Sequence, residues 1–265
     1  MSNPRAISDT SLIPLVARIH CSKNFPEYFF DPKALSLEGH IPDDTILGNS
    51  SEYSLLASVA RYRNMDSMVR SFVARYPQAN VVYLGCGLET AYFRLNEPRA
   101  TFYELDLPEI MAKRAELLGG AQNDILIPAD AFDLDWAKRL DPQTPTLLVA
   151  SGLFQYFAEP KITRFIADAK QTFPNVELIF DATNQKGLKY VNRYLKKTGN
   201  DLLIHFYIDD ALEFSKKVNS HLLEERPFFT EARKTLAKKL KLYTRIAMRV
   251  VDAKKRAIIL RLKLN

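Results

Sequence analysis

A pair of glycines separated by one residue follows an apolar run in the segment 81–90, whose sequence is VVYLGCGLET. Gly85 and Gly87 permit a tight turn of the backbone because they carry no Cβ, and Cys86 lies between them. The apolar run predicts a buried strand, and a short helix is expected directly after the turn. A helix N-terminus at such a turn presents backbone N–H groups and the positive end of its dipole. The segment therefore predicts a site for a nucleotide-like ligand, even though Leu88–Thr90 take the place of a third glycine.

Acidic and polar residues follow the later strands that the sequence predicts. Asp106 lies about 20 residues after the turn, where an acidic residue accepts hydrogen bonds from both ribose hydroxyls of a nucleotide. Asp130 is placed to accept a hydrogen bond from an adenine amino group, beside the backbone N–H of Ala131. Either aspartate could instead cap the helix that follows it, and Glu104 competes with Asp106 from a deeper position. Because open α/β sheets bind ligands at the carboxyl ends of their strands, these residues and Ser151 are expected to share one site.

Helices and strands that the sequence pattern predicts must position these side chains. Residues 1–75 are expected to be mainly helical, because apolar residues recur at helical spacing in 11–20 and 51–76. From residue 81 onward, short apolar strands alternate with helical segments, which indicates βαβ units and a parallel sheet. Strands are expected at 81–84, 101–105, 125–127, 146–150 and 176–181.

The last third of the chain has a different pattern. Residues 184–240 are expected to be mostly helical, with a basic face in 184–197. Segments 245–251 and 257–264 are expected to form a hairpin, because leucines alternate with cations in the second segment. Five parallel strands and this antiparallel hairpin would make an α/β, Rossmann-like sheet of seven strands. That arrangement favours a class I methyltransferase fold over a six-stranded dinucleotide-binding fold.

We expect one domain over the whole chain, since no linker-like or repeated segment interrupts it. Its expected parts are an N-terminal helical cap (1–75), a donor-binding core that would hold the methyl donor of such a fold (80–183), a helical cap insertion (184–240) and a C-terminal β-hairpin (241–265).

The composition argues against several classes of protein. With 265 residues, of which 47% are hydrophobic, the chain can bury a sizeable core. It has neither a run of about 20 apolar residues nor a signal peptide, and Cys21 and Cys86 make no disulfide framework. A reduced, cytoplasmic protein without a membrane partner is therefore expected. The net charge is +6, and many of the lysine and arginine residues that cause it lie near the C-terminus. Solvated helix and hairpin faces explain it better than nucleic-acid binding, because no aromatic residues are interleaved with the cations.

The joint spacing of several short segments is specific, although each one alone is not. The segments are IPLVAR at 13–18, DPKA at 31–34, Arg61 five residues before Asp66, the glycine turn at 81–90, YELDLPE at 103–109, SGLFQYF at 151–157 and FDATN at 180–184. Together they make the chain resemble the leucine carboxyl methyltransferase-like family, specifically its bacterial branch of small-molecule, polyketide-type O-methyltransferases. The resemblance covers most of the chain. It implies a class I fold with an N-terminal helical cap and S-adenosyl-L-methionine as methyl donor.

The amino-acid end of that donor carries a carboxylate, which needs a cation. Arg61 and Arg18 are the candidates because a guanidinium binds a carboxylate bidentately, and a surface position is the alternative for both. The resemblance itself implies that Arg61, Gly85, Asp106 and Asp130–Ala131 contact the donor. The full set of expected donor-binding residues is Arg18, Arg61, Gly85, Cys86, Gly87, Asp106, Asp130, Ala131 and Ser151.

Three positions depart from the patterns of related enzymes. Class I enzymes often have an acid where this chain has Tyr83, but the family generally lacks that acid too. The family usually has Asp in the turn where Glu89 stands. Many relatives have Glu, which contacts the methionine amino group, where this chain has Ser151. Ser151 can form a hydrogen bond but cannot neutralise an ammonium group, so the affinity or the pose of the donor could differ.

The reaction that the resemblance implies needs little chemistry from the protein. The sulfonium of the donor is already activated, so the enzyme mainly supplies proximity, orientation and exclusion of water. A carboxylate acceptor needs no general base, whereas a hydroxyl would benefit from one. Tyr156, His205 and Tyr207 are candidates on the acceptor side, with packing or surface positions as the alternative. The histidines and cysteines show no metal-ligand spacing, and a small-molecule acceptor, with a monomer or a homodimer, is expected.

Two other functions remain open from the sequence. A nicotinamide-dependent oxidoreductase fits Gly85, Gly87 and Asp106, but the missing third glycine and the expected hairpin argue against it. A donor-binding homologue without catalysis, in a regulatory role, stays possible because of Ser151. A nucleic-acid methyltransferase is disfavoured, because no Asn/Asp-Pro-Pro-Tyr-like motif is present.

Overall fold

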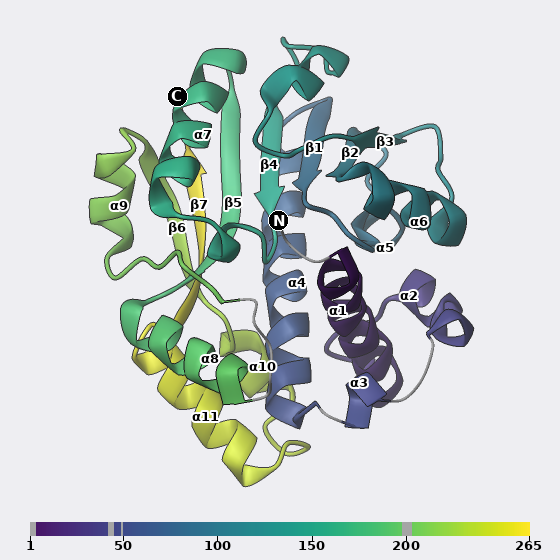
Figure 1. The fold of residues 1–265 in the computed structure, drawn as a ribbon, viewed down its shortest axis with the longest axis vertical. Coiled ribbons are helices and arrows are strands. Elements are labelled where there is room, and N and C mark those ends of the chain that lie inside the picture. Colours follow the sequence, from purple (N-terminus) through teal and green to yellow (C-terminus); the bar gives the residue numbers. More distant parts are fainter. Residues whose placement is uncertain (1–3, 42–44, 49, 198–202) are drawn as a thin grey trace.

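The computed structural model describes residues 4–41, 45–48, 50–197 and 203–265. Parts of both expected helical caps, at 1–3, 42–44, 49 and 198–202, lie outside the described residues. Within the described parts of the chain, seven strands form one sheet in the order β3-β2-β1-β4-β5-β7-β6 (Figure 1). The expected α/β fold with a seven-stranded sheet is therefore confirmed.

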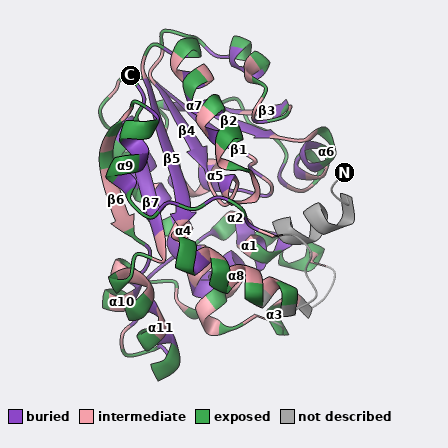
Figure 2. Ribbon diagram, turned by 60° about the vertical axis from the view of Figure 1, so that its left-hand side comes forward, coloured by how far each residue is buried: buried purple, intermediate pink, exposed green. Residues whose placement is uncertain are grey.

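The strands carry the apolar runs that the sequence pattern indicated. They are β1 (Ala79–Leu84), β2 (Ala100–Asp106), β3 (Asp124–Pro128), β4 (Thr146–Ala150), β5 (Val176–Thr183), β6 (His221–Pro227) and β7 (Ala257–Lys263). β1 to β5 pair in parallel, and β7 is antiparallel to both β5 and β6. Every residue of β1 and β4 is buried, as expected for central parallel strands covered on both faces. Figure 2 shows these strands as the buried centre of the molecule.

The expected C-terminal hairpin is only half right. Residues 245–251 lie in a helix, α11 (Leu242–Ala253), not in a strand. Its buried residues Thr244 and Met248 are four positions apart, which is helical spacing rather than the alternation of a strand. The antiparallel partner of β7 is instead β6, which lies in the segment expected to be mostly helical. β6 is a half-exposed edge strand with charged residues at 224–226, so it lacks the apolar alternation that would have revealed it.

A group of helices precedes the first strand in the chain. They are α1 (Pro4–Asn24), α2 (Pro32–Ser36), the 3₁₀ turn Glu38–His40, α3 (Thr45–Gly48) and α4 (Glu52–Val73). The side chain of Ser51 accepts a hydrogen bond from the backbone N–H of Ser54 and caps α4. α4 buries one face against the sheet, in the same core cluster as Val81 and Tyr83. Val82 and Leu84 belong to the core on the opposite face of the sheet, because side chains alternate along a strand.

The remaining helices lie between and after the strands in the chain, and the cores on both faces of the sheet include buried residues from them. They are α5 (Ala91–Leu95), α6 (Pro108–Leu118), the 3₁₀ helices η2 (Leu134–Arg139) and η3 (Phe154–Tyr156), α7 (Glu159–Thr172), α8 (Gln185–Lys197), α9 (Ala211–Lys217) and α10 (Thr230–Thr235). In the part of the chain that the structure describes, no helix has both the length and the apolar composition needed to cross a membrane.

Candidate active site

The chain leaves β1 through a turn that only glycine fits well. Gly85 and Gly87 have φ angles of +61° and +50°, in the region that other L-residues rarely adopt. A Cβ built on Gly85 would also lie 2.7 Å from Cδ1 of Leu153. The tight turn that the two glycines predicted is therefore present, and it brings the backbone close to the side chain of Leu153, in the loop after β4.

A cavity of about 450 Å³ lies between this turn and the carboxyl ends of the neighbouring strands. Ten of the residues singled out in the sequence line it together, namely Arg18, Arg61, Gly85, Cys86, Gly87, Asp106, Asp130, Ala131, Ser151 and Tyr156. His205 and Tyr207 are not among its lining residues. They are exposed on an extended segment whose alternate residues are buried, so the structure does not bring these two acceptor-side candidates into the cavity.

Asp106 is the last residue of β2 and faces the glycine turn. Its Oδ2 accepts a hydrogen bond from the N–H of Gly87 at 2.7 Å, and its Oδ1 accepts one from the N–H of Leu107 at 2.8 Å. It makes no capping hydrogen bond to α6 beyond that, so the cap interpretation does not describe it. Burial raises the pKa of Asp106, although the two N–H groups act in the opposite direction. Asp130 is exposed at the rim and accepts from the N–H of Phe132 at 2.9 Å.

Arg61 reaches the other end of the cavity from α4. Its Nη1 lies 3.4 Å from Oδ2 of Asp181, whose Oδ1 accepts a hydrogen bond from the N–H of Gly152 at 2.6 Å. Gly152 has a φ of +70°, and a Cβ there would lie 2.8 Å from Nη1 of Arg61, so glycine makes room for the guanidinium. Oγ of Ser151 is buried and has no hydrogen-bond partner among the described residues. The sequence suggested a carboxylate at the end of β5 but no role for it, and the structure shows that Asp181 positions Arg61.

Arg18 lines the cavity, but the hydrogen bonds of its guanidinium go to the glycine turn. Its side chain is 1% exposed. Nη1 donates to Oγ1 of Thr90 at 2.5 Å, and Nη2 donates to the carbonyl of Leu88 at 2.6 Å. Nη1 also lies 3.4 Å from Oδ2 of Asp31 and 3.5 Å from Oε1 of Glu89. Arg18 therefore ties α1 to the turn, and its guanidinium is already shared among protein groups.

Arg94, which the sequence did not single out, completes this buried network. It donates to both carboxylate oxygens of Asp66, at 2.7 and 2.8 Å, to Oδ2 of Asp31 at 2.9 Å and to Oε1 of Glu89 at 3.1 Å. Burial alone would raise the pKa of Asp31, but Arg18 and Arg94 lower it below its ordinary value. Glu89 thus serves the network that holds the turn. The arginine-rich network joins segments far apart in the sequence, which is why its partners could not be paired from spacing.

Arg114, a third buried arginine, also binds the glycine turn. Nη1 of Arg114, on α6, donates to the carbonyl of Glu89 at 2.5 Å and to that of Gly87 at 3.2 Å. With Arg18 on the carbonyl of Leu88, three successive carbonyl groups of the turn are held by two buried arginines. Nη2 of Arg114 lies 3.3 Å from Oε1 of Glu104, and both side chains are fully buried. Glu104 is therefore part of the support under the turn and does not compete with Asp106 for a ligand.

Glu104→Gln is expected to change how stability depends on pH. Burial raises the pKa of Glu104 to about 8, with Arg114 acting in the opposite direction, whereas an unfolded chain would titrate near about 4.3. The folded state therefore holds this proton more tightly, and its contribution to stability falls as the pH rises from about 4.3 to about 8. The free energy of unfolding, measured by denaturant titration across this window, should fall faster in the parent than in the variant, by at most about 1.4 kcal/mol per pH unit. Parallel curves for the two proteins would contradict the buried, protonated state.

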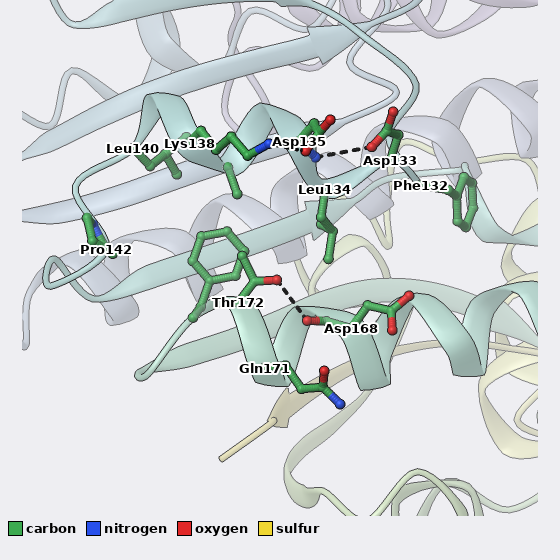
Figure 3. Close-up of a pocket in the computed structure, with 12 residues that line it drawn as sticks. Phe132, Asp133, Leu134, Asp135, Lys138, Leu140, Pro142, Asp168, Gln171 and Thr172 are labelled. Carbon is green, nitrogen blue, oxygen red and sulfur yellow. Dashed lines mark hydrogen bonds and ion pairs between the residues drawn. The ribbon is translucent and has the colours of Figure 1, made fainter.

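A larger open groove lies elsewhere, between η2 and α7 (Figure 3). Several of its polar groups already have partners, since Asp135 pairs with Lys138, and Oγ1 of Thr172 donates to the carbonyl of Asp168. None of the predicted donor-binding residues lines it. Among the described residues, no group of His, Cys, Asp and Glu side chains could hold a metal ion. The predicted donor-binding residues therefore line the first cavity and not this groove.

The sheet order, with β7 antiparallel between β5 and β6, and the cavity at the glycine turn are those of class I methyltransferases. The leucine carboxyl methyltransferase family matches residues 27–169, and the chain belongs to this family. The resemblance inferred from the sequence is thus confirmed.

Known proteins similar to the chain include both a curated relative and solved structures. The tetracenomycin polyketide synthesis O-methyltransferase TcmP of Streptomyces glaucescens is 28% identical over 142 residues, which are 52% of this chain and 53% of that protein. The match thus spans about half the length of that curated relative. A DUF574 family protein from Streptomyces avermitilis has a TM-score of 0.59 at 12% identity, covering 94% of this chain and 96% of its own. Magnesium protoporphyrin IX methyltransferase from Synechocystis, solved with bound SAH, has a TM-score of 0.51 at 14% identity, covering 82% and 89%. These two structures support the fold.

Proposed function

We propose that this chain is an S-adenosylmethionine-dependent O-methyltransferase that acts on a small molecule. S-Adenosylmethionine is the methyl donor of the family to which the chain belongs. The observation that carries the proposal is the convergence of Asp106, Arg61 and the glycine turn on one cavity at the carboxyl ends of the strands. The relative TcmP, a polyketide O-methyltransferase, supports oxygen as the methylated atom.

The residues present fit this donor. Oγ of Ser151 and Nε of Arg61 are buried polar atoms without partners among the described residues, and both residues line the cavity. In the proposed arrangement Asp106 accepts from the ribose hydroxyls, and Asp130 and Ala131 hold the adenine. Arg61 holds the carboxylate, and Ser151 accepts a hydrogen bond from the amino group. When bound, the donor supplies a methyl group activated by its sulfonium.

The cavity suits a methyl acceptor that is already ionised near neutral pH, such as a carboxylate. None of the described residues that line the cavity is a histidine. Burial raises the pKa of Tyr156, so its phenol stays protonated and is a poor general base. The carboxylates of Asp106 and Asp130 are assigned to the donor. The protein's own part in the reaction is then to orient the acceptor, through groups such as Tyr156 and Gln155, and to keep water out.

Donor binding and turnover test this proposal separately. Isothermal titration calorimetry should show binding of S-adenosylmethionine. Mass spectrometry should show methyl transfer to at least one member of a panel of carboxylic acids and phenols, as a methyl ester of an acid or a methyl ether of a phenol. Thermal stabilisation by NAD but not by S-adenosylmethionine would instead establish the oxidoreductase alternative. If the chain shows no donor binding and no methyl transfer to any acceptor, the proposed function is refuted.

The alternative function, a regulatory protein that binds the donor without catalysis, depends on Ser151. If the chain is an enzyme, Ser151→Ala should weaken donor binding by about tenfold, the value of one hydrogen bond, and leave turnover measurable at saturating donor. If the chain only binds the donor, the parent should show no turnover, and Ser151→Glu, which restores a negative charge next to the donor's ammonium group, should create it. Calorimetry and a single-turnover methylation assay on the three proteins separate the two cases.

A further inference from the structure

α11 carries an exposed apolar stripe that the fold does not use. Its inner face is formed by Thr244 and Met248. On the outer face, Leu242, Tyr243, Ile246 and Val250 are 68%, 70%, 55% and 39% exposed. Positions 242, 246 and 250 are one helical turn apart, so these side chains form a continuous stripe along the helix. Arg245 and Arg249 are also exposed and border the stripe on one side.

α8, which starts beside the end of α11, adds a basic surface. Lys186, Lys189, Arg193 and Lys196 are exposed, and α8 contains no acidic residue. Nδ2 of Asn184 donates to the carbonyl of Lys254 at 2.9 Å, which fixes the start of α8 beside the end of α11. Figures 1 and 2 both show the two helices as neighbours at the end of the molecule beyond the carboxyl ends of the strands. The only acid of α11, Asp252, instead faces inward, where it accepts from the N–H of Phe229 and pairs with Arg233.

We propose that this surface, formed by the exposed residues of α8 and the outer stripe of α11, binds the surface of an anionic lipid membrane. Helices that lie in a membrane interface combine an apolar stripe with lysine and arginine on the flanking face, and basic side chains are attracted to anionic headgroups. Here α11 supplies the apolar stripe, and both helices supply the cations. The expectation from the sequence, that no membrane is involved, rested on spanning segments and does not cover surface binding.

Charge and shape favour a lipid surface over the other occupants. A second copy of the chain would bring two basic faces together, and the net charge of the chain is already +6. A nucleic acid would satisfy the cations but would leave the aliphatic side chains of the stripe without apolar partners. α11 protrudes at the edge of the molecule (Figure 1), and a deformable lipid interface can cover a protruding helix without a matching groove.

Vesicle co-sedimentation of the 265-residue chain tests the proposal. Vesicles of phosphatidylcholine with about one third phosphatidylglycerol should bind the protein at least about tenfold more strongly than phosphatidylcholine alone, and added salt should weaken the binding. The double variants Arg245→Glu/Arg249→Glu and Leu242→Ser/Ile246→Ser should each reduce binding to the anionic vesicles by about tenfold or more. All four positions are exposed, so circular dichroism and donor binding should be unchanged.

A matched control comes from α9, where Leu212 and Lys216 are also exposed. Leu212→Ser/Lys216→Glu should leave vesicle binding unchanged. Equal binding to both types of vesicle, no binding to either, or an equal loss in the α9 variant would overturn the proposal. So would binding of a fluorescent RNA that depends on Arg245 and Arg249 while vesicles are not bound.

Discussion

Asp106→Ala is expected to weaken the binding of S-adenosylmethionine by about 100-fold or more. In the proposed arrangement this carboxylate accepts hydrogen bonds from two ribose hydroxyls, and each bond to a charged group contributes about 1.5–3 kcal/mol. The N–H groups of Gly87 and Leu107, at 2.7 and 2.8 Å, hold both oxygens in place. The carboxylate is therefore already oriented before the ligand binds, and little of this energy is spent on ordering it.

Calorimetry with S-adenosylmethionine measures the change, and thermal unfolding without ligand checks that the variant folds. A control is Asp168→Ala, in the groove of Figure 3, which should leave the dissociation constant unchanged. If Asp106→Ala binds the donor within about threefold of the parent, or if Asp168→Ala weakens binding as strongly, the ribose assignment is wrong.

The parts of the site that lie at the carboxyl ends of the strands could be predicted from the sequence. Gly85 and Gly87 follow an apolar run, and Asp106 follows the next strand at a spacing that βαβ geometry fixes. The positions of these residues needed only local pattern and the rule that parallel strands end at the same edge. The alternation of strands and helices between residues 81 and 181 was predicted for the same reason.

The tertiary partners of the arginines could not be predicted in this way. Arg18 was expected to bind the donor, yet its hydrogen bonds go to Leu88 and Thr90, about 70 residues away in sequence. Nothing in spacing distinguishes an arginine that binds a ligand from one that binds a turn. The prediction of a strand at 245–251 was wrong for a related reason. Arg245, Ile246 and Val250 fit an exposed strand as well as an exposed helix face.

Arg94→Met is expected to lower the free energy of unfolding by about 3–5 kcal/mol, the cost of removing one partner from a buried ion network. Arg94 is buried and donates to three carboxylates, including both oxygens of Asp66. Without it, Asp66 would lose its bidentate partner, and Asp31 and Glu89 would keep only their longer contacts with Arg18. The glycine turn would then lose part of its support. Arg94→Lys should fall in between, because an ammonium keeps the charge but cannot bind Asp66 bidentately.

Arg70→Met is the matched control, since Arg70 forms an ion pair with Glu97 at 2.6 Å but is 49% exposed. An exposed pair of this kind contributes about 0–1 kcal/mol. Denaturant titration of both variants measures the difference, and equal losses would contradict the burial argument.

The pH dependence of the Arg94→Met loss separates charge from packing. With Arg94 present, burial still raises the pKa of Asp66, although Arg94 acts to lower it. Without Arg94, the folded-state pKa of Asp66 would lie further above its value in the unfolded chain. The folded state of the variant would then bind protons more tightly, so its stability would rise relative to the parent as the pH falls toward about 5. A loss that stays constant over this range would assign the effect to the cavity left by the side chain, whereas a shrinking loss assigns it to the unpaired carboxylates around the turn.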